Sequence, residues 1–289
     1  MTLGSLIEEA WRDHADHPEV VATRLADALP QVERPEDIAP FVRIAVHVHG
    51  EHLGDWQRGV RLLLSLRESR AFDGTGATAD PLARGIAALR AFGSEPSALA
   101  GLSDDDGAYA LAIAASALVA RKQWAPAIDA FDRAAATASR GLARDHPAVR
   151  AMAVCGNNVA AALEAKPDLD TAEQRAMLDA AAAGLKYWKL SGTWLEEERA
   201  EYQLSRCLLR AGRLPAARAS IERCIDVCAR NDAPAFELFF GHAVKALVSR
   251  AEGDAAGFDS ARRAALEQYA RVPEGERAWC DREFRDLGA

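Results

Sequence analysis

Apolar residues recur at intervals of three and four along most of the chain, and short polar breaks separate these runs. This spacing places the apolar side chains on one face of a helix, whereas the alternation typical of β-strands is almost absent. The pattern therefore predicts about fourteen helices. Their expected ranges are 5–14, 18–30, 36–50, 55–69, 81–92, 104–121, 124–140, 147–165, 171–190, 194–210, 214–230, 234–250, 255–270 and 274–286.

A short signature recurs at four of the breaks between helices. It reads Leu-Gly-Asp-Trp at 53–56, Lys-Gln-Trp at 122–124, Ala-Gly-Arg-Leu at 211–214 and Glu-Gly-Asp-Ala at 252–255. Most connections are short, so consecutive helices should pair antiparallel. The sequence thus predicts an all-α fold, an α-α superhelix of stacked antiparallel helical hairpins. Arrays of this kind present extended binding surfaces.

Two stretches carry a matching order of packing residues. The first has Leu111, Ala114, Ala115 and Leu118 in one helix and Trp124, Ala127, Ile128, Phe131 and Ala134 in the next. The second has Leu204, Ser205, Leu208, Gly212, Leu214, Ala217, Ile221 and Cys224. With these residues, and fainter copies around Gly54 and Gly253, the chain resembles the tetratricopeptide repeat family. The glycines at 212 and 253 stand about 41 positions apart, against about 34 in that family. The resemblance therefore implies a TPR-like array with irregular spacing.

The weakest helical signal lies at 72–78, where glycine and threonine replace the apolar pattern. This stretch indicates a joint between N-terminal helical hairpins at 1–72 and a TPR-like repeat array at 80–289. Asp80 before Pro81 is typical of an N-cap, so the next helix is expected to begin at residue 81. The glycines lack a phosphate-loop lysine and a preceding strand, which argues against nucleotide binding.

Charge and cysteine content narrow the function classes. The net charge is −8 and the pI is about 5.5, which disfavours nucleic acids and anionic membrane surfaces as partners. The apolar runs are too short for a membrane span. The five cysteines are scattered over apolar helix faces, which favours reduced thiols. With no signal peptide expected at the N-terminus, the protein is predicted to be cytoplasmic.

The resemblance places a binding groove along the first helix of each hairpin. The matching positions near the 211–214 turn are Arg199, Tyr202, Arg206 and Arg210. Their spacing of three and four puts them on one helix face, and we call them the arginine stripe. Guanidinium groups bind carboxylates through paired, charge-assisted hydrogen bonds. The alternative is a solvated face that is balanced by neighbouring glutamates.

Two further groups are candidates for binding. Asn157 and Asn158 are similar to an Asn-Asn run in some first helices of the family, where the amides pair with a peptide backbone or terminal carboxylate. The alternative is one solvent-facing and one capping residue. The aromatic residues are Tyr187, Trp188, Trp194, Phe236, Phe239 and Phe240. Their spacing favours the core for most of them, and an exposed Trp188 or Phe240 would be a binding anchor.

Metal ligands and catalytic groups are not predicted. His47, His49, Glu51 and His52 are close in sequence. On an α-helix, however, His49 and His52 share one face while His47 and Glu51 share another. Cys224 and Cys228, with Cys207 on the partner helix, lack an obvious fourth ligand. No Gly-x-Ser-x-Gly elbow is present. No metal, cofactor or catalytic residue is therefore expected.

The leading hypothesis is a non-enzymatic scaffold or adaptor that binds a protein or peptide in a concave helical-repeat groove. The arginine stripe favours a partner with an acidic or carboxylate-bearing segment. A homodimer through terminal-helix or convex-face packing is a further option. One alternative is a small-molecule sensor or enzyme with a pocket between helices. Another is a structural assembly subunit with an apolar outer patch at Trp279 and Phe284.

Overall fold

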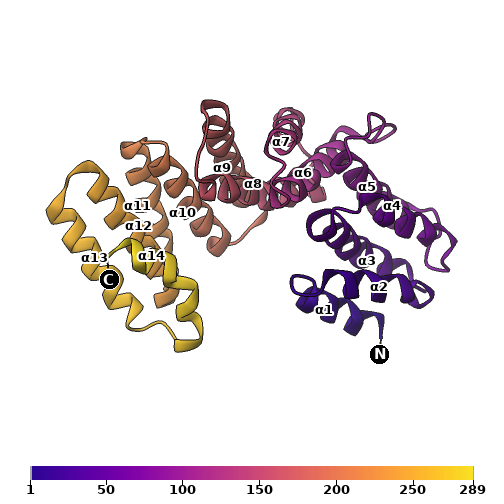
Figure 1. Cartoon of the computed structure of the whole chain (residues 1–289), viewed down its shortest axis with the longest axis horizontal. Coiled ribbons are helices and arrows are strands. Elements are labelled where there is room, and N and C mark those ends of the chain that lie inside the picture. The colour runs from indigo at the N-terminus through magenta and orange to yellow at the C-terminus, as the bar shows by residue number, and fades with distance from the viewer. Residues whose placement is uncertain (1, 289) are drawn as a thin grey trace. The chain divides into compact units, whose positions relative to one another are not determined.

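Successive helices pair along the chain and make an all-α fold of helical hairpins (Figure 1). The computed structural model describes residues 2–288, and within them there are fourteen α-helices and no strand. All the ranges predicted from the sequence correspond to helical segments. The last one, 274–286, forms as the 3₁₀ segment η4 (Glu274–Cys280) followed by the short helix α14 (Asp281–Asp286).

The chain divides into two compact units, Met1–Cys155 and Gly156–Ala289. The first contains α1 (Leu3–Asp13), α2 (Pro18–Asp27), η1 (Leu29–Gln31), α3 (Pro35–His47), the π-helical segment η2 (Val48–Leu53), α4 (Trp56–Ser65), η3 (Leu66–Glu68), α5 (Gly76–Phe92), α6 (Asp104–Ala120) and α7 (Trp124–Ala138). The helix α8 (Pro147–Ala165) spans the boundary. The second contains α9 (Thr171–Ser191), α10 (Trp194–Arg210), α11 (Leu214–Arg230), α12 (Ala235–Glu252), α13 (Ala255–Tyr269), η4 and α14.

Each unit has its own apolar core. In the first unit, large residues such as Phe41, Leu63 and Leu89 are fully enclosed among many small ones. The helix α6 is buried around most of its circumference because it packs between α5 and α7, which explains its nearly unbroken apolar sequence. In the second unit α10, α11 and α12 pack in order (Figure 1), and Phe239 and Ile221 are fully buried.

Three of the four copies of the turn signature share one backbone geometry. Lys122, Gly212 and Gly253 all adopt left-handed conformations, with φ of 58°, 69° and 77°. The next residue in each turn donates its N–H to a carbonyl five residues back, at 2.9 Å in all three cases. This is the Schellman ending of a helix, which satisfies carbonyls that the helix leaves unpaired. The signature therefore marks the place where each helix reverses into its partner.

Because Lys122 carries a side chain in the left-handed region, its turn is strained where the others are not. Replacing Lys122 with Gly is expected to raise the free energy of unfolding by about 0.5–1 kcal/mol, the steric relief less the entropy that glycine gains when unfolded. Urea denaturation followed by circular dichroism measures the change. Gly212→Ala is the matched opposite and should destabilise. A loss of stability in Lys122→Gly would contradict the inference that the backbone at Lys122 is strained.

The region 72–78 is more ordered than its composition indicates. Asp73 accepts hydrogen bonds from the backbone N–H of Thr75 and from the hydroxyls of Thr75 and Thr78, at 2.9, 2.7 and 2.7 Å. These bonds start α5 at Gly76, so the prediction of Asp80 as its N-cap is wrong. The stretch lies inside the first unit, where α5 packs against α3, α4 and α6.

Candidate functional site

The arginine stripe lies on α10, and its central residue is enclosed by carboxylates of the second unit. Arg206 is buried and donates to Glu164 at 3.0 Å and to Glu283 at 2.5 Å. The hydroxyl of Tyr202 donates to the same Glu283 carboxylate at 2.6 Å. Glu164 belongs to the last turn of α8 and Glu283 to α14. The chain's own C-terminal helix thus supplies a carboxylate at the position that the sequence analysis assigned to a ligand.

The charges around Arg206 form a compensated network. Arg282 donates to Glu164 at 2.8 Å, so two arginines and two glutamates alternate. Burial acts to raise the pKa of Glu164, but Arg206 and Arg282 outweigh it and hold that pKa below its usual value. Burial raises the pKa of Tyr202, which therefore acts as a donor. The network therefore connects α14 to α10 and to the end of α8.

The outer two arginines of the stripe have different surroundings. The Arg199 side chain is 53% exposed, and it pairs with Glu237 of α12 through its Nε at 3.3 Å and through Nη2. Arg210 donates to the carbonyl oxygens of Lys166 and Pro167, the latter at 2.9 Å. Arg210 therefore holds the α8–α9 connection, while Arg199 faces solvent. The binding role of the stripe stays a prediction.

A surface hollow adjoins Arg199. Its volume is about 720 Å³, and its walls include Arg199, Phe236, Glu237, Arg271, Glu276 and Trp279. We call it the Trp279 hollow, because the Trp279 side chain on η4 is 75% exposed. Phe284, which the sequence grouped with Trp279, instead packs on Tyr269 with ring centroids 4.4 Å apart. Of the four stripe residues, Arg199 is the one that lines this hollow.

The asparagine pair is divided between two environments. Asn158 is exposed, whereas Asn157 is half-buried with its side-chain oxygen lying against Gly184 of α9. A Cβ on Gly184 would stand 2.3 Å from that oxygen, and one on Gly156 would stand 2.8 Å from the Ala180 carbonyl. Glycines therefore allow α8 and α9 to approach closely here. Asn157 faces this crossing and lies mid-helix, so it is not a cap.

The aromatic group is mainly core, as the spacing favours. Tyr187, Trp188 and Phe239 are buried. Phe236 and Phe240 are half-buried and meet edge to face with ring centroids 5.1 Å apart. Trp188 and Phe240 are therefore not exposed anchors, and Phe236 reaches the surface at the Trp279 hollow.

Two groups of side chains within residues 2–288 bring potential metal donors together. The first is Glu198 with Cys224 and Cys228, all buried, with the Glu198 carboxylate 3.3 and 3.6 Å from the two sulfurs. Burial and the neighbouring Glu237 raise the pKa of Glu198 to about 10. A carboxyl with this pKa is neutral at pH 7 and faces the two thiols as an uncharged group. Cys207 is elsewhere, 3.9 Å from the Ala160 carbonyl oxygen.

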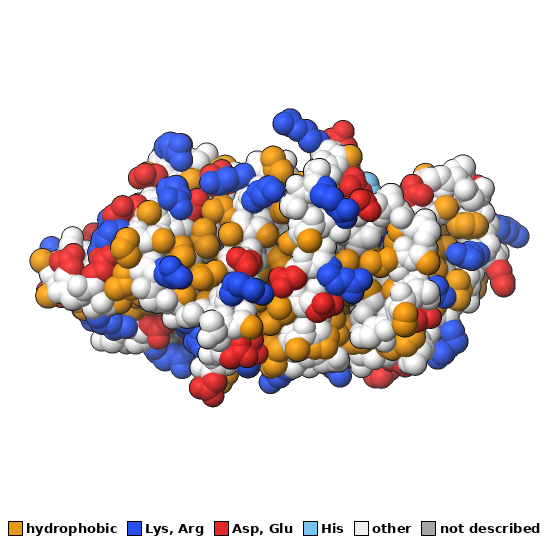
Figure 2. Space-filling view, turned by 90° about the horizontal axis from the view of Figure 1, so that it is seen from above, with side chains coloured by type: hydrophobic (Ala, Val, Ile, Leu, Met, Phe, Trp, Pro, Cys, Tyr) orange, Lys and Arg blue, Asp and Glu red, His pale blue; other side chains and the backbone are white. Residues whose placement is uncertain are grey.

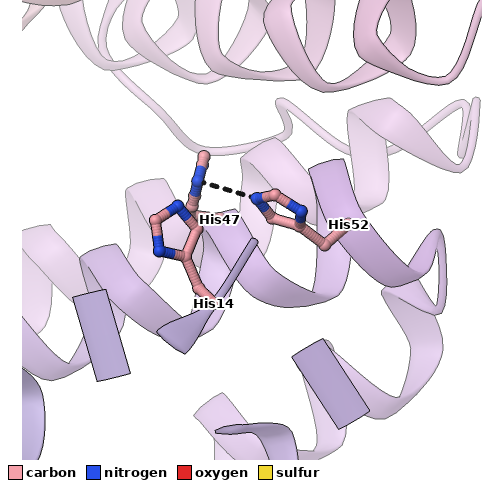
Figure 3. Close-up of side chains that lie close together, drawn as sticks. All are labelled: His14, His47 and His52. Carbon is pink, nitrogen blue, oxygen red and sulfur yellow. Dashed lines mark hydrogen bonds between the residues drawn. The ribbon is translucent and has the colours of Figure 1, made fainter. Parts of the chain in front are cut away.

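The second group is His14, His47 and His52 in the first unit (Figure 3). The expectation that His47 and His52 lie on different faces is wrong, because residues 48–53 form a π-helical turn instead of an α-helical one. His49 points into the core and is 1% exposed. His14 lies 33 positions before His47, and nothing in the sequence links the two.

No family model matches the chain, and no curated protein matches it significantly. Within residues 2–288, no helix combines the length and apolar character that crossing a membrane requires.

Proposed function

We propose that this protein is a non-enzymatic scaffold or adaptor that binds a carboxylate-bearing segment of a protein or peptide. The observation that carries the proposal is the Trp279 hollow, where an exposed tryptophan stands beside Arg199 and Arg271. Tryptophan and arginine are the residues that most often dominate binding energy at interfaces. Guanidinium groups select planar carboxylates.

The hollow carries two arginines and two glutamates, and the state of the two arginines supports an acidic partner. Arg271 donates to the side chain of Gln268 and forms no ion pair with any residue in 2–288, so its charge is available to a ligand. Arg199 forms an ion pair with Glu237, and its side chain is half-exposed. The exposed part of its guanidinium group can therefore bind a second carboxylate. Arg206, another arginine of α10, already binds the carboxylate of the buried Glu283. This contact shows the arginine–carboxylate pairing that we propose for the ligand.

The remaining surface and the cysteines agree with a cytoplasmic binding protein. Figure 2 shows basic and acidic side chains intermixed over the face that it presents, which is unlike the basic stripe of a nucleic-acid partner. All five cysteines are free and buried. Burial raises the pKa of Cys155 and of Cys207 to about 12, so both stay protonated and unreactive. We include in this proposal that the helices form a TPR-like array and that the chain forms a homodimer.

Selection from a library of random displayed peptides tests the proposal with the intact chain. We expect enriched peptides to combine Asp or Glu with a large apolar residue. Their Kd, measured by calorimetry, should rise by about tenfold or more in Arg199→Glu and in Trp279→Ala, which corresponds to about 1.4 kcal/mol for each anchor.

Arg213→Glu is the matched control, because Arg213 is an exposed arginine in the α10–α11 turn outside the hollow. It should bind the selected peptides as the wild type does. Peptides that bind all three variants equally, or a library that yields no acidic ligand, would contradict the proposal.

A further inference from the structure

Three imidazoles from separate parts of the first unit face one another. His14 is the C-cap of α1, His47 is the last residue of α3, and His52 lies in η2. The ring centroids of each pair are 4.8 or 4.9 Å apart. One nitrogen from each ring can be chosen so that all three lie within 4.8 Å of one another. Figure 3 shows the rings turned toward a common point, and we call them the histidine cluster.

The π-helical turn brings two of these rings together. In a π-helix a residue is bonded to the residue five positions on, so side chains five apart lie over each other. His47 and His52 have this separation, and their Nε2 atoms are 3.1 Å apart. An α-helical turn would place them on different faces. Such π-turns occur frequently at functional sites.

A hydrogen bond at His14 and an ion-pair contact at His47 indicate which nitrogens of these two rings face inward. Nδ1 of His14 lies 2.7 Å from the Trp11 carbonyl oxygen, which can only accept, so this nitrogen carries the proton. Nδ1 of His47 lies 3.4 Å from the Glu51 carboxylate, which favours the same tautomer. When these two rings are neutral, the lone pair of each is on Nε2. Backbone carbonyls and carboxylates orient metal-binding histidines in this way.

The histidine cluster lies against neighbouring side chains and is still reached by solvent. His14, His47 and His52 are all half-buried. Trp11 packs against His47 with ring centroids 5.1 Å apart, and the Arg43 guanidinium carbon lies 5.3 Å from the centroid of the Trp11 ring. Arg121 also stands close and donates to the His52 carbonyl at 2.8 Å.

We propose that the histidine cluster binds one divalent transition-metal ion of the zinc class through three imidazole nitrogens, with solvent in the fourth position. Two nitrogens that each stand about 2.0–2.1 Å from a tetrahedral ion lie roughly 3.3 Å apart. The His47–His52 contact is close to this separation; with the tautomers above it is a hydrogen bond from Nε2–H of His52 to Nε2 of His47. The ion would replace this hydrogen bond once His52 carries its proton on Nδ1, and a His14 nitrogen lies within 4.8 Å of both other donors. A ligand set of nitrogen alone favours zinc, copper or nickel over magnesium and calcium.

Zinc titration of the metal-free full chain by calorimetry tests this proposal. We expect one Zn²⁺ per chain, with the affinity lowered on the order of 100-fold in His14→Ala, His47→Ala and His52→Ala. Glu51→Gln should lower it by about tenfold, because the carboxylate orients His47 without touching the metal. His17→Ala is the matched control, an exposed histidine three positions from His14, and should bind as the wild type does.

X-ray absorption at the zinc edge is measured on the wild-type protein, so its result does not depend on whether a variant folds. The proposal predicts a first shell of nitrogen and oxygen only, at about 2.0–2.1 Å, with imidazole scattering. A sulfur shell near 2.3 Å would place the ion at the cysteines and overturn the proposal. Absence of stoichiometric binding, or full affinity in folded His14→Ala and His52→Ala, would overturn it as well.

Discussion

Replacing Arg206 with Met is expected to lower the free energy of unfolding of the second unit by about 3–5 kcal/mol. Methionine fills much of the same volume, so the main loss is electrostatic. The Glu164 and Glu283 side chains are 7% and 4% exposed, and each would lose a charge-assisted partner at a buried position. Glu283 would keep the Tyr202 hydroxyl, and Glu164 would keep Arg282.

Urea denaturation followed by far-UV circular dichroism measures this loss, and neutralising the acids should reverse part of it. The triple variant Arg206→Met, Glu164→Gln, Glu283→Gln leaves no buried carboxylate without its arginine, so it should recover a large share of the stability. Arg213→Met, on the exposed turn, should stay within about 0.5 kcal/mol of the wild type. A loss below about 1 kcal/mol in Arg206→Met would mean that the network is not desolvated.

The helical fold could be predicted from the sequence because its determinants are local. Apolar spacing reports the buried face of each helix, and the turn signatures report the left-handed residue that ends it. The exceptions have local causes too. Asp73 organises its own turn and starts α5 before Asp80. The six residues after His47 adopt a π-turn that α-helical spacing rules do not anticipate.

The environment of the candidate sites was harder to predict, because it depends on contacts between distant positions. Spacing placed Tyr202 and Arg206 on one face correctly, and both meet the same carboxylate. That carboxylate, Glu283, lies 77 residues beyond Arg206. His14 meets His47 only through the packing of α1 against α3. A single sequence shows which residues are present, but it does not show which distant residues meet in the folded protein.

The two buried glutamates of α10 are expected to respond to neutralisation in opposite ways. Glu201 accepts from Lys189 and Arg223 at 3.2 and 3.0 Å and from Ser220, and these partners hold its pKa below its usual value against the effect of burial. Glu201→Gln should therefore destabilise by about 2 kcal/mol at pH 7. The stability that ionised Glu201 contributes is present above its unfolded pKa and is lost as pH falls below about 4.5.

Glu198→Gln should instead stabilise the protein at pH 7, by up to about 3 kcal/mol. The folded pKa of Glu198 is about 10 and its unfolded value 4.5, because burial, Glu237 and the Cys228 thiol oppose its charge, while Arg199 is 3.8 Å away. Between these values the folded state holds a proton that the unfolded state has released, so stability falls as pH rises. Glutamine is neutral throughout and can still accept from both thiols.

Denaturation of the wild type and of both variants at pH 5, 7 and 9 separates the two cases. The advantage of Glu198→Gln over the wild type should be small at pH 5 and should grow by about 1.4 kcal/mol per pH unit above it. The deficit of Glu201→Gln should stay constant over the same range, since Glu201 is ionised in both states. An advantage that does not change with pH would mean that Glu198 is ionised in the folded protein, with Arg199 as its counter-ion.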